Sequence, residues 1–78
     1  MKVEVLFFGS LTEHTGTSSV TLEDVGNTGQ LLAALESRWP GLMDRTHRLA
    51  LNQAFVKGDE VSLKDGDEVA IMPPFAGG

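Results

Sequence analysis

The sequence predicts an α+β fold, in which one main helix packs across one face of a mixed sheet. Three observations support this prediction: apolar residues alternate with polar ones near the start of the chain, recur at helical spacing in the middle, and form a short run just before a Pro-Pro pair. The chain has 78 residues, which is enough for one domain, and we assign residues 1–78 to it. A domain this small buries only about 60% of its unfolded surface. We therefore expect an efficient core or assistance from a partner.

The first predicted strand covers residues 2–8, which are rich in β-branched and aromatic side chains. Alternation places three apolar residues on one face, which is the predicted core face: Val3, Val5 and Phe7. Leu6 and Phe8 point to the other face. Residues 13–16 are expected to form a loop. Residues 19–23 alternate polar and apolar side chains, which predicts a second strand that forms a hairpin with the first.

A helix is predicted to begin at Asn27 or Thr28, because either residue is a suitable N-cap. Pro40 and Gly41 end this helix, since proline disfavours helical geometry in the residue before it. The helix carries one apolar stripe, formed by Leu31, Leu32, Leu35 and Trp39. We expect this stripe to cover the core face of the sheet.

Three short strands are predicted after the helix. They cover residues 48–51, 54–56 and 68–72, with turns at residues 52–53, 57–59 and 63–67. In the last strand, Val69 and Ile71 face the core. The order of strand, strand, helix, short strands and strand suits a β-grasp (ubiquitin-like) fold, in which the first and last strands lie side by side at the centre of the sheet.

The charge of the chain excludes some classes of partner. Acidic residues outnumber basic ones by 11 to 6, and the formal net charge is −5 at pH 7. Nucleic acid and anionic membranes are therefore not expected as partners, because both require a basic surface. A basic protein partner fits better. Every uninterrupted apolar run in the sequence, residues 5–8 among them, is far too short to span a membrane.

The usual catalytic and metal-binding patterns are missing from the sequence. The absence of cysteine excludes disulfides, thiolate metal sites and a cysteine nucleophile, and it fits the reducing cytoplasm. His14 and His47 lie far apart in the sequence, without the spacing of metal ligands. The acidic residues between positions 59 and 68 lack the spacing of a calcium loop. We expect no bound metal and no bound cofactor.

The C-terminal sequence is the most unusual part of the chain, and it reads Pro73-Pro74-Phe75-Ala76-Gly77-Gly78. We expect residues 73–78 to form a flexible tail, whose proline pair ends the last strand and restricts the base of the tail. Glycine has no Cβ, so Gly77 and Gly78 fit a narrow channel in another protein. A free carboxylate at Gly78 is a poor electrophile and needs activation, for instance adenylation with ATP. Because the chain has no cysteine, any sulfur or acyl group that it carries must sit on that carboxylate.

The predicted sheet also has an apolar patch on the face away from the helix. Four residues of the first and last strands contribute to it: Leu6, Phe8, Ala70 and Met72. Phe75 extends the patch beside the tail. Exposed apolar patches of this kind usually mark an interface, so we predict that a partner protein docks here.

These features resemble the family of small, sulfur-carrier subunits of molybdopterin synthase, which are ubiquitin-like proteins. The resemblance covers nearly the whole chain. It rests on Val5-Leu6-Phe7-Phe8, on Leu49-Ala50-Leu51-Asn52-Gln53, and on Asp65-Gly66-Asp67-Glu68-Val69-Ala70 followed by the Pro-Pro-x-x-Gly-Gly ending. That ending after a Gly-Asp-Glu-Val strand is the most specific element.

The resemblance implies that Gly78 is adenylated by an E1-like activating enzyme, which uses ATP, and is then converted to a thiocarboxylate by a persulfide sulfur donor. It implies that the tail inserts into the large catalytic subunit, where the thiocarboxylate supplies sulfur to cyclic pyranopterin monophosphate and builds the dithiolene of molybdopterin. Two carriers and two large subunits then form a heterotetramer. Catalytic lysines and arginines belong to the large subunit, and Phe8, Met72 and Phe75 are interface positions of this non-catalytic subunit.

Three alternatives remain open from the sequence. The same carrier chemistry serves other recipients, in thiamine or cysteine synthesis or in tRNA thiolation, although thiamine carriers generally lack the Pro-Pro-x-x-Gly-Gly ending. A protein modifier would use the activated Gly78 to form isopeptide bonds with lysines. A plain interaction domain would have an inert tail.

Overall fold

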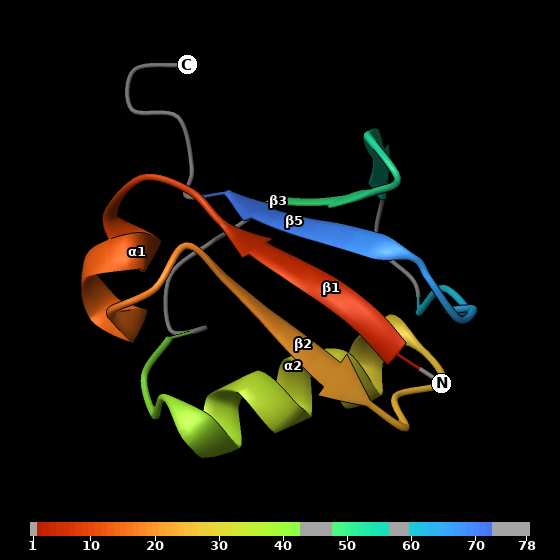
Figure 1. Cartoon of the computed structure of the whole chain (residues 1–78), viewed down its shortest axis with the longest axis horizontal. Coiled ribbons are helices and arrows are strands. Elements are labelled where there is room, and N and C mark those ends of the chain that lie inside the picture. Colours follow the sequence, from red (N-terminus) through yellow and green to blue (C-terminus); the bar gives the residue numbers. More distant parts are fainter. Residues whose placement is uncertain (1, 43–47, 57–59, 73–78) are drawn as a thin grey trace.

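The computed structural model describes residues 2–42, 48–56 and 60–72 (Figure 1). The elements in chain order are β1 (Lys2–Phe7), α1 (Ser10–Thr15), β2 (Ser19–Glu23), α2 (Thr28–Arg38), β3 (Arg48–Leu51), β4 (Ala54–Val56) and β5 (Glu68–Met72). Within these described ranges, neither helix has the length and apolar character needed to cross a membrane.

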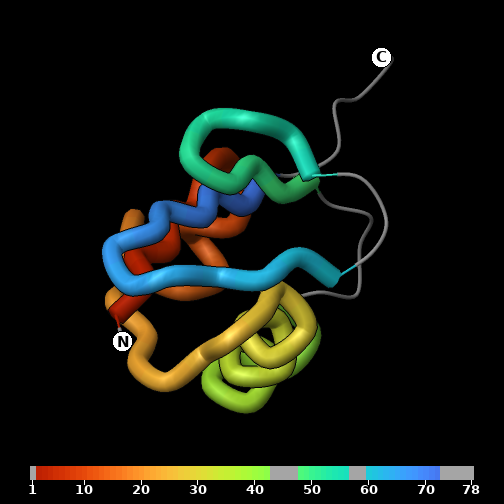
Figure 2. Tube along the Cα trace, turned by 90° about the vertical axis from the view of Figure 1, so that its right-hand side faces the viewer, coloured from red at the N-terminus to blue at the C-terminus, as the bar shows by residue number. Residues whose placement is uncertain are grey.

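The described strands form one five-stranded sheet in the order β2-β1-β5-β3-β4. β1 and β5 run parallel at its centre, with Val5 opposite Val69, and the other neighbouring strands are antiparallel. α2 packs on one face of this sheet (Figure 2). The predicted α+β arrangement, the hairpin of the first two strands and the central pairing of the first and last strands are therefore confirmed.

The core lies between the sheet and α2. All the predicted core residues of β1 and β5 are buried: Val3, Val5, Phe7, Val69 and Ile71. Leu31 and Leu35 of α2 pack against them and are also fully buried. Trp39 follows the last residue of α2, and its ring meets that of Phe7 edge-on with 5.5 Å between the ring centroids. The predicted stripe thus covers the core face, and Trp39 closes the core at the end of the helix.

The first turn of α2 is fixed by side chains. The side-chain oxygen of Asn27 accepts a hydrogen bond from the N–H of Gln30 at 2.8 Å, so Asn27 is the N-cap. Thr28 is buried, and it both donates its N–H to the carbonyl oxygen of Val61 and accepts the N–H of Val61 on its hydroxyl. This double contact holds the segment before β5 against the helix. It also buries Leu63, which the sequence placed in a polar turn.

The prediction of a loop at residues 13–16 is wrong, because the structure has the short helix α1 there. Gly16 ends α1 in the left-handed region, at φ 75°, and donates its N–H to the carbonyl oxygen of Thr12. Leu11 is the residue of α1 that packs against the core, so the segment shows no apolar periodicity in the sequence. β1 also ends at Phe7, one residue earlier than predicted.

A polar turn at residues 64–67 leads into β5, and hydrogen bonds hold it against the turn between β3 and β4. Gly66 supplies the left-handed backbone of this turn, at φ 86°. The carboxylate of Asp67 accepts hydrogen bonds from the side-chain amide of Asn52 at 3.0 Å and from the N–H of Lys64 at 2.7 Å. The amide oxygen of Asn52 in turn accepts the N–H of Glu68. The hydrogen bond from the Asn52 side chain, followed by that from the Lys64 N–H, lowers the pKa of Asp67 below its ordinary value of 3.8.

We expect Asp67→Ala to lower the melting temperature at neutral pH, because it removes the two hydrogen bonds that the carboxylate accepts from Asn52 and Lys64. Since the folded state lowers the pKa of this carboxyl, its contribution to stability is fully present above the ordinary value of 3.8 and is lost as pH falls through the folded-state value. The difference in melting temperature between the unaltered chain and the variant should therefore shrink below that pH. Circular dichroism melts across an acid series measure it, and a difference that stays constant into acid contradicts this role for Asp67.

Candidate functional site

The candidate site lies at the end of the sheet where β5 leaves it at Met72. Six predicted site residues follow Met72 directly in the sequence and lie outside the described residues: Pro73, Pro74, Phe75, Ala76, Gly77 and Gly78. Their roles stay predictions. The described part of the site is the surface from which this segment starts.

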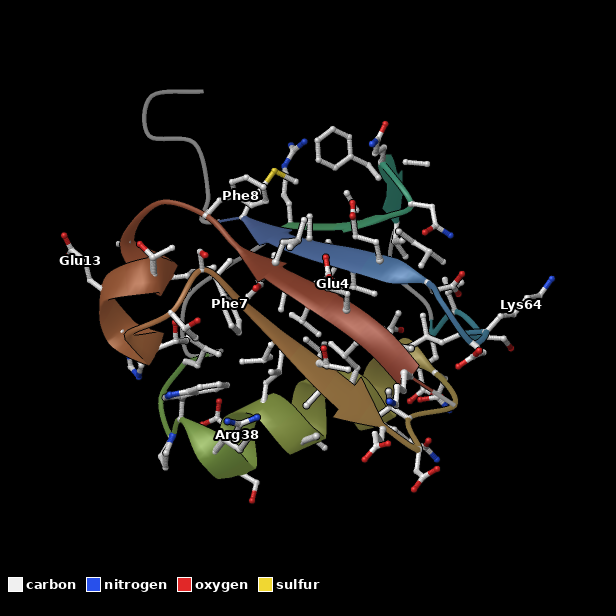
Figure 3. The ribbon with its side chains drawn as sticks, in the orientation of Figure 1. Glu4, Phe7, Phe8, Glu13, Arg38 and Lys64 are labelled. Carbon is white, nitrogen blue, oxygen red and sulfur yellow. The ribbon has the colours of Figure 1, made fainter. Side chains whose placement is uncertain are left out.

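The other four predicted site residues lie on the sheet face away from α2. Leu6 and Ala70 are Cα partners in the parallel pair of β1 and β5, and alternation puts both opposite the buried face. Phe8 donates its N–H to the carbonyl oxygen of Ile71 at 3.1 Å, which places it beside the end of β5, next to Met72. Phe7 and Phe8 point to opposite sides of the sheet (Figure 3). The predicted face of these residues is therefore confirmed.

The exposure of these residues fits a docking surface. The side chain of Phe8 is 46% exposed, although aromatic residues this large usually lie inside. Leu6, Ala70 and Met72 are each half-buried, since they share this face with their neighbours. The described part of the chain thus presents apolar side chains to solvent beside the start of the predicted tail.

β3 and β4 also contribute to this face, which the sequence pattern alone did not predict. Ala50 of β3 is the Cα partner of both Ala70 and Phe55, so one row crosses the sheet from Leu6 to Phe55. Phe55 is 57% exposed, and the guanidinium carbon of Arg48 lies 5.5 Å from the centre of its ring. We call the partly or largely exposed members of this set the apolar patch: Leu6, Phe8, Phe55, Ala70 and Met72. Ala50 itself is buried, at 6% exposure.

The signal that places Phe55 in the apolar patch was available in the sequence. A two-residue turn was predicted at residues 52–53, and it fixes the register of the strands on either side. That register sets Phe55 opposite Ala50. Asn52 and Gln53 adopt the left-handed backbone of such a turn, with φ of 49° and 71°.

A metal centre finds no support in the described residues, where no group of three or more potential ligands of the His, Cys, Asp or Glu type lies close together. His14 lies on α1, and His47 falls outside the described ranges. The chain as a whole contains no cysteine.

Comparison with known protein families matches residues 5–78 to the ThiS family. A protein of Chlamydomonas reinhardtii, named molybdopterin synthase sulfur carrier subunit, is 42% identical to this chain and the match covers 100% of both. A human protein of the same name is 39% identical, with 99% of this chain and 94% of the human protein covered.

Solved structures with the same arrangement of elements confirm the predicted β-grasp fold. The small archaeal modifier protein 1 of Methanosarcina acetivorans matches with a TM-score of 0.84 and 26% identity, covering 99% of this chain and 96% of that one. The complex of subunits 1 and 2 of the molybdopterin-converting factor of Helicobacter pylori contains a chain that matches with a TM-score of 0.72 and 29% identity, covering 100% of both.

The neighbouring residues Phe7 and Phe8 allow a matched test of the two faces. Phe7→Ala should cost about 3–5 kcal/mol of unfolding free energy, because it opens a cavity beside Trp39 in the core. Phe8→Ala should cost less than about 1 kcal/mol, because nearly half of this residue is in water already. Urea unfolding followed by circular dichroism measures both values, and a loss of several kcal/mol for Phe8→Ala would show that the face is wrongly assigned.

Proposed function

Because this chain belongs to the ThiS family, we propose that it is the small, sulfur-carrier subunit of a molybdopterin synthase. The observation that carries the proposal is the match to the Chlamydomonas protein of that name, which runs the full length of both chains. Further relatives from Mycobacterium tuberculosis and Escherichia coli have the same name, at 37% and 38% identity. The apolar patch beside the end of β5 fits such a role, because a carrier must dock before it delivers its cargo.

The carrier chemistry takes place on the carboxylate of Gly78. An E1-like enzyme joins this carboxylate to the AMP part of ATP, and pyrophosphate leaves. The terminal sulfur of a persulfide donor then displaces AMP and forms an acyl disulfide, which a thiol reductant cleaves to leave the thiocarboxylate. The chain supplies no thiol of its own, since it contains no cysteine. It needs no resident metal or cofactor for this cycle, and ATP is a substrate of the activating enzyme.

The large subunit of the synthase is the proposed recipient. In this proposal the apolar patch docks on the large subunit, and residues 73–78 enter its active site, where sulfur passes to cyclic pyranopterin monophosphate. The Helicobacter pylori structure supports the pairing, since it is a complex of subunits 1 and 2 of the molybdopterin-converting factor. Two carriers and two large subunits form a cytoplasmic heterotetramer. The small subunit is non-catalytic, and the residues that act on the pterin belong to the large subunit.

A protein modifier is the second candidate function. It is favoured by the similarity to the small archaeal modifier protein 1 of Methanosarcina acetivorans, which has the same fold at 26% identity. In this role a lysine amine, rather than a persulfide, displaces AMP from the activated Gly78 and forms an isopeptide bond. The full-length matches to sulfur-carrier subunits at higher identity favour the carrier.

Deletion of Gly78 should abolish molybdopterin formation and leave the fold intact. The truncated chain still ends in a glycine carboxylate, at Gly77, but this group falls one residue, about 3.5 Å, short of its position in the large subunit. The assay reconstitutes molybdopterin synthesis from the pterin precursor with the large subunit, the activating enzyme and a sulfur donor. Circular dichroism is the control for folding. Retained activity in the truncated protein would refute the carrier assignment.

A further inference from the structure

Two glutamates lie side by side in the sheet, next to the apolar patch. Glu4 of β1 and Glu68 of β5 are Cα partners in the parallel pair, and they stand two residues before Leu6 and Ala70 of the apolar patch. Alternation puts all four on the face away from α2. Like charges directly opposite each other in a sheet are destabilising. The strand pair at the centre of the fold therefore carries a repulsion that the core must offset.

Within the part of the chain that the structure describes, no basic side chain is paired with these two glutamates. Among the described residues, neither the Glu4 nor the Glu68 carboxylate forms an ion pair, and the same holds for the ammonium group of Lys2 on the same face of β1. The Cα partner of Glu4 on β2 is Thr21, which carries no charge. The amide group of Asn52, beside Glu68, donates to Asp67 instead. The two charges are thus left for a group outside this part of the chain.

We propose that Glu4 and Glu68 bind a lysine or arginine side chain of the partner protein that docks on the apolar patch. This inference rests on the proposed function and takes the large synthase subunit as that partner. Its surface must then carry an apolar contact and a basic side chain about 7 Å away, which is the length of two residues along a strand. The net charge of −5 on the whole chain favours such a basic partner.

Glu68 and the apolar patch follow one another along β5, and together they orient a bound partner. The carboxylate of Glu68 lies at the start of β5, and the apolar patch continues to its end at Met72, where residues 73–78 follow. A partner that pairs its cation with the carboxylates and its apolar contact with the patch binds in one direction. That direction points the C-terminal segment at the same place on the partner each time. Charge at this position therefore sets orientation and association rate more than it sets final affinity.

The test compares Glu4→Gln, Glu68→Gln and the double variant with Glu13→Gln. The control residue Glu13 lies on α1, away from Glu4 (Figure 3), and its substitution changes the net charge by the same amount as each single variant. Binding to the large subunit is followed by stopped-flow at several salt concentrations. We expect the association rate constant of the double variant to fall at least about threefold at low salt and to approach that of the unaltered chain at high salt. Glu13→Gln should change it little.

The free proteins provide a second readout, which separates binding from folding. Removing the like-charge contact should raise the melting temperature of Glu68→Gln by about 2–4 °C. A variant that is more stable alone yet binds more slowly supports the inference. The inference is overturned if the double variant associates as fast as the unaltered chain, or is slowed no more than Glu13→Gln. It is also overturned if the double variant associates more slowly only because it is less stable. If the unaltered chain does not bind the large subunit at all, the proposed function fails and takes this inference with it.

Discussion

The parallel pairing of β1 with β5 is the contact on which the rest of this structure depends. On one face it buries Val3, Val5, Val69 and Ile71 beneath α2. On the other face the same register puts Leu6 beside Ala70, and Glu4 beside Glu68. It also brings the end of β5 next to Phe8, so that residues 73–78 start at the edge of the apolar patch. One strand pair thus sets the core, the proposed docking surface and the starting point of the proposed sulfur-bearing segment.

In this arrangement the same few residues must stabilise the fold and also form the proposed docking surface. In a domain of 78 residues the core has little surplus stability, yet the strands at its centre also expose apolar and like-charged side chains. Hydrogen bonds at the ends of the sheet offset part of the stability lost in this way. Asp67 and Asn52 join β5 to the β3–β4 turn, and Thr28 holds the segment before β5 against α2. The result is a fold that leaves apolar side chains exposed on one face of its sheet.

Much of this fold was predictable because its signals are local. Alternation in β1 and β5 fixed which side chains are buried, and Asn27 marked the start of α2 as its N-cap. α1 was not predictable from periodicity, since its one residue in the core, Leu11, gives no repeat. To place Phe55 in the apolar patch, one must first predict the turn at residues 52–53 and then the pairing of Phe55 with Ala50. The repulsion between Glu4 and Glu68 appears only once the register of two strands distant in sequence is known.

The central claim is that this chain carries sulfur on the carboxylate of Gly78. Intact-mass spectrometry tests it most directly, after the purified chain has been incubated with its activating enzyme, ATP and a persulfide donor. A carrier gains the mass difference between sulfur and oxygen, and the gain disappears when the large subunit and the pterin precursor are added. An unchanged mass, or conjugates of higher mass joined through lysine, would contradict the claim.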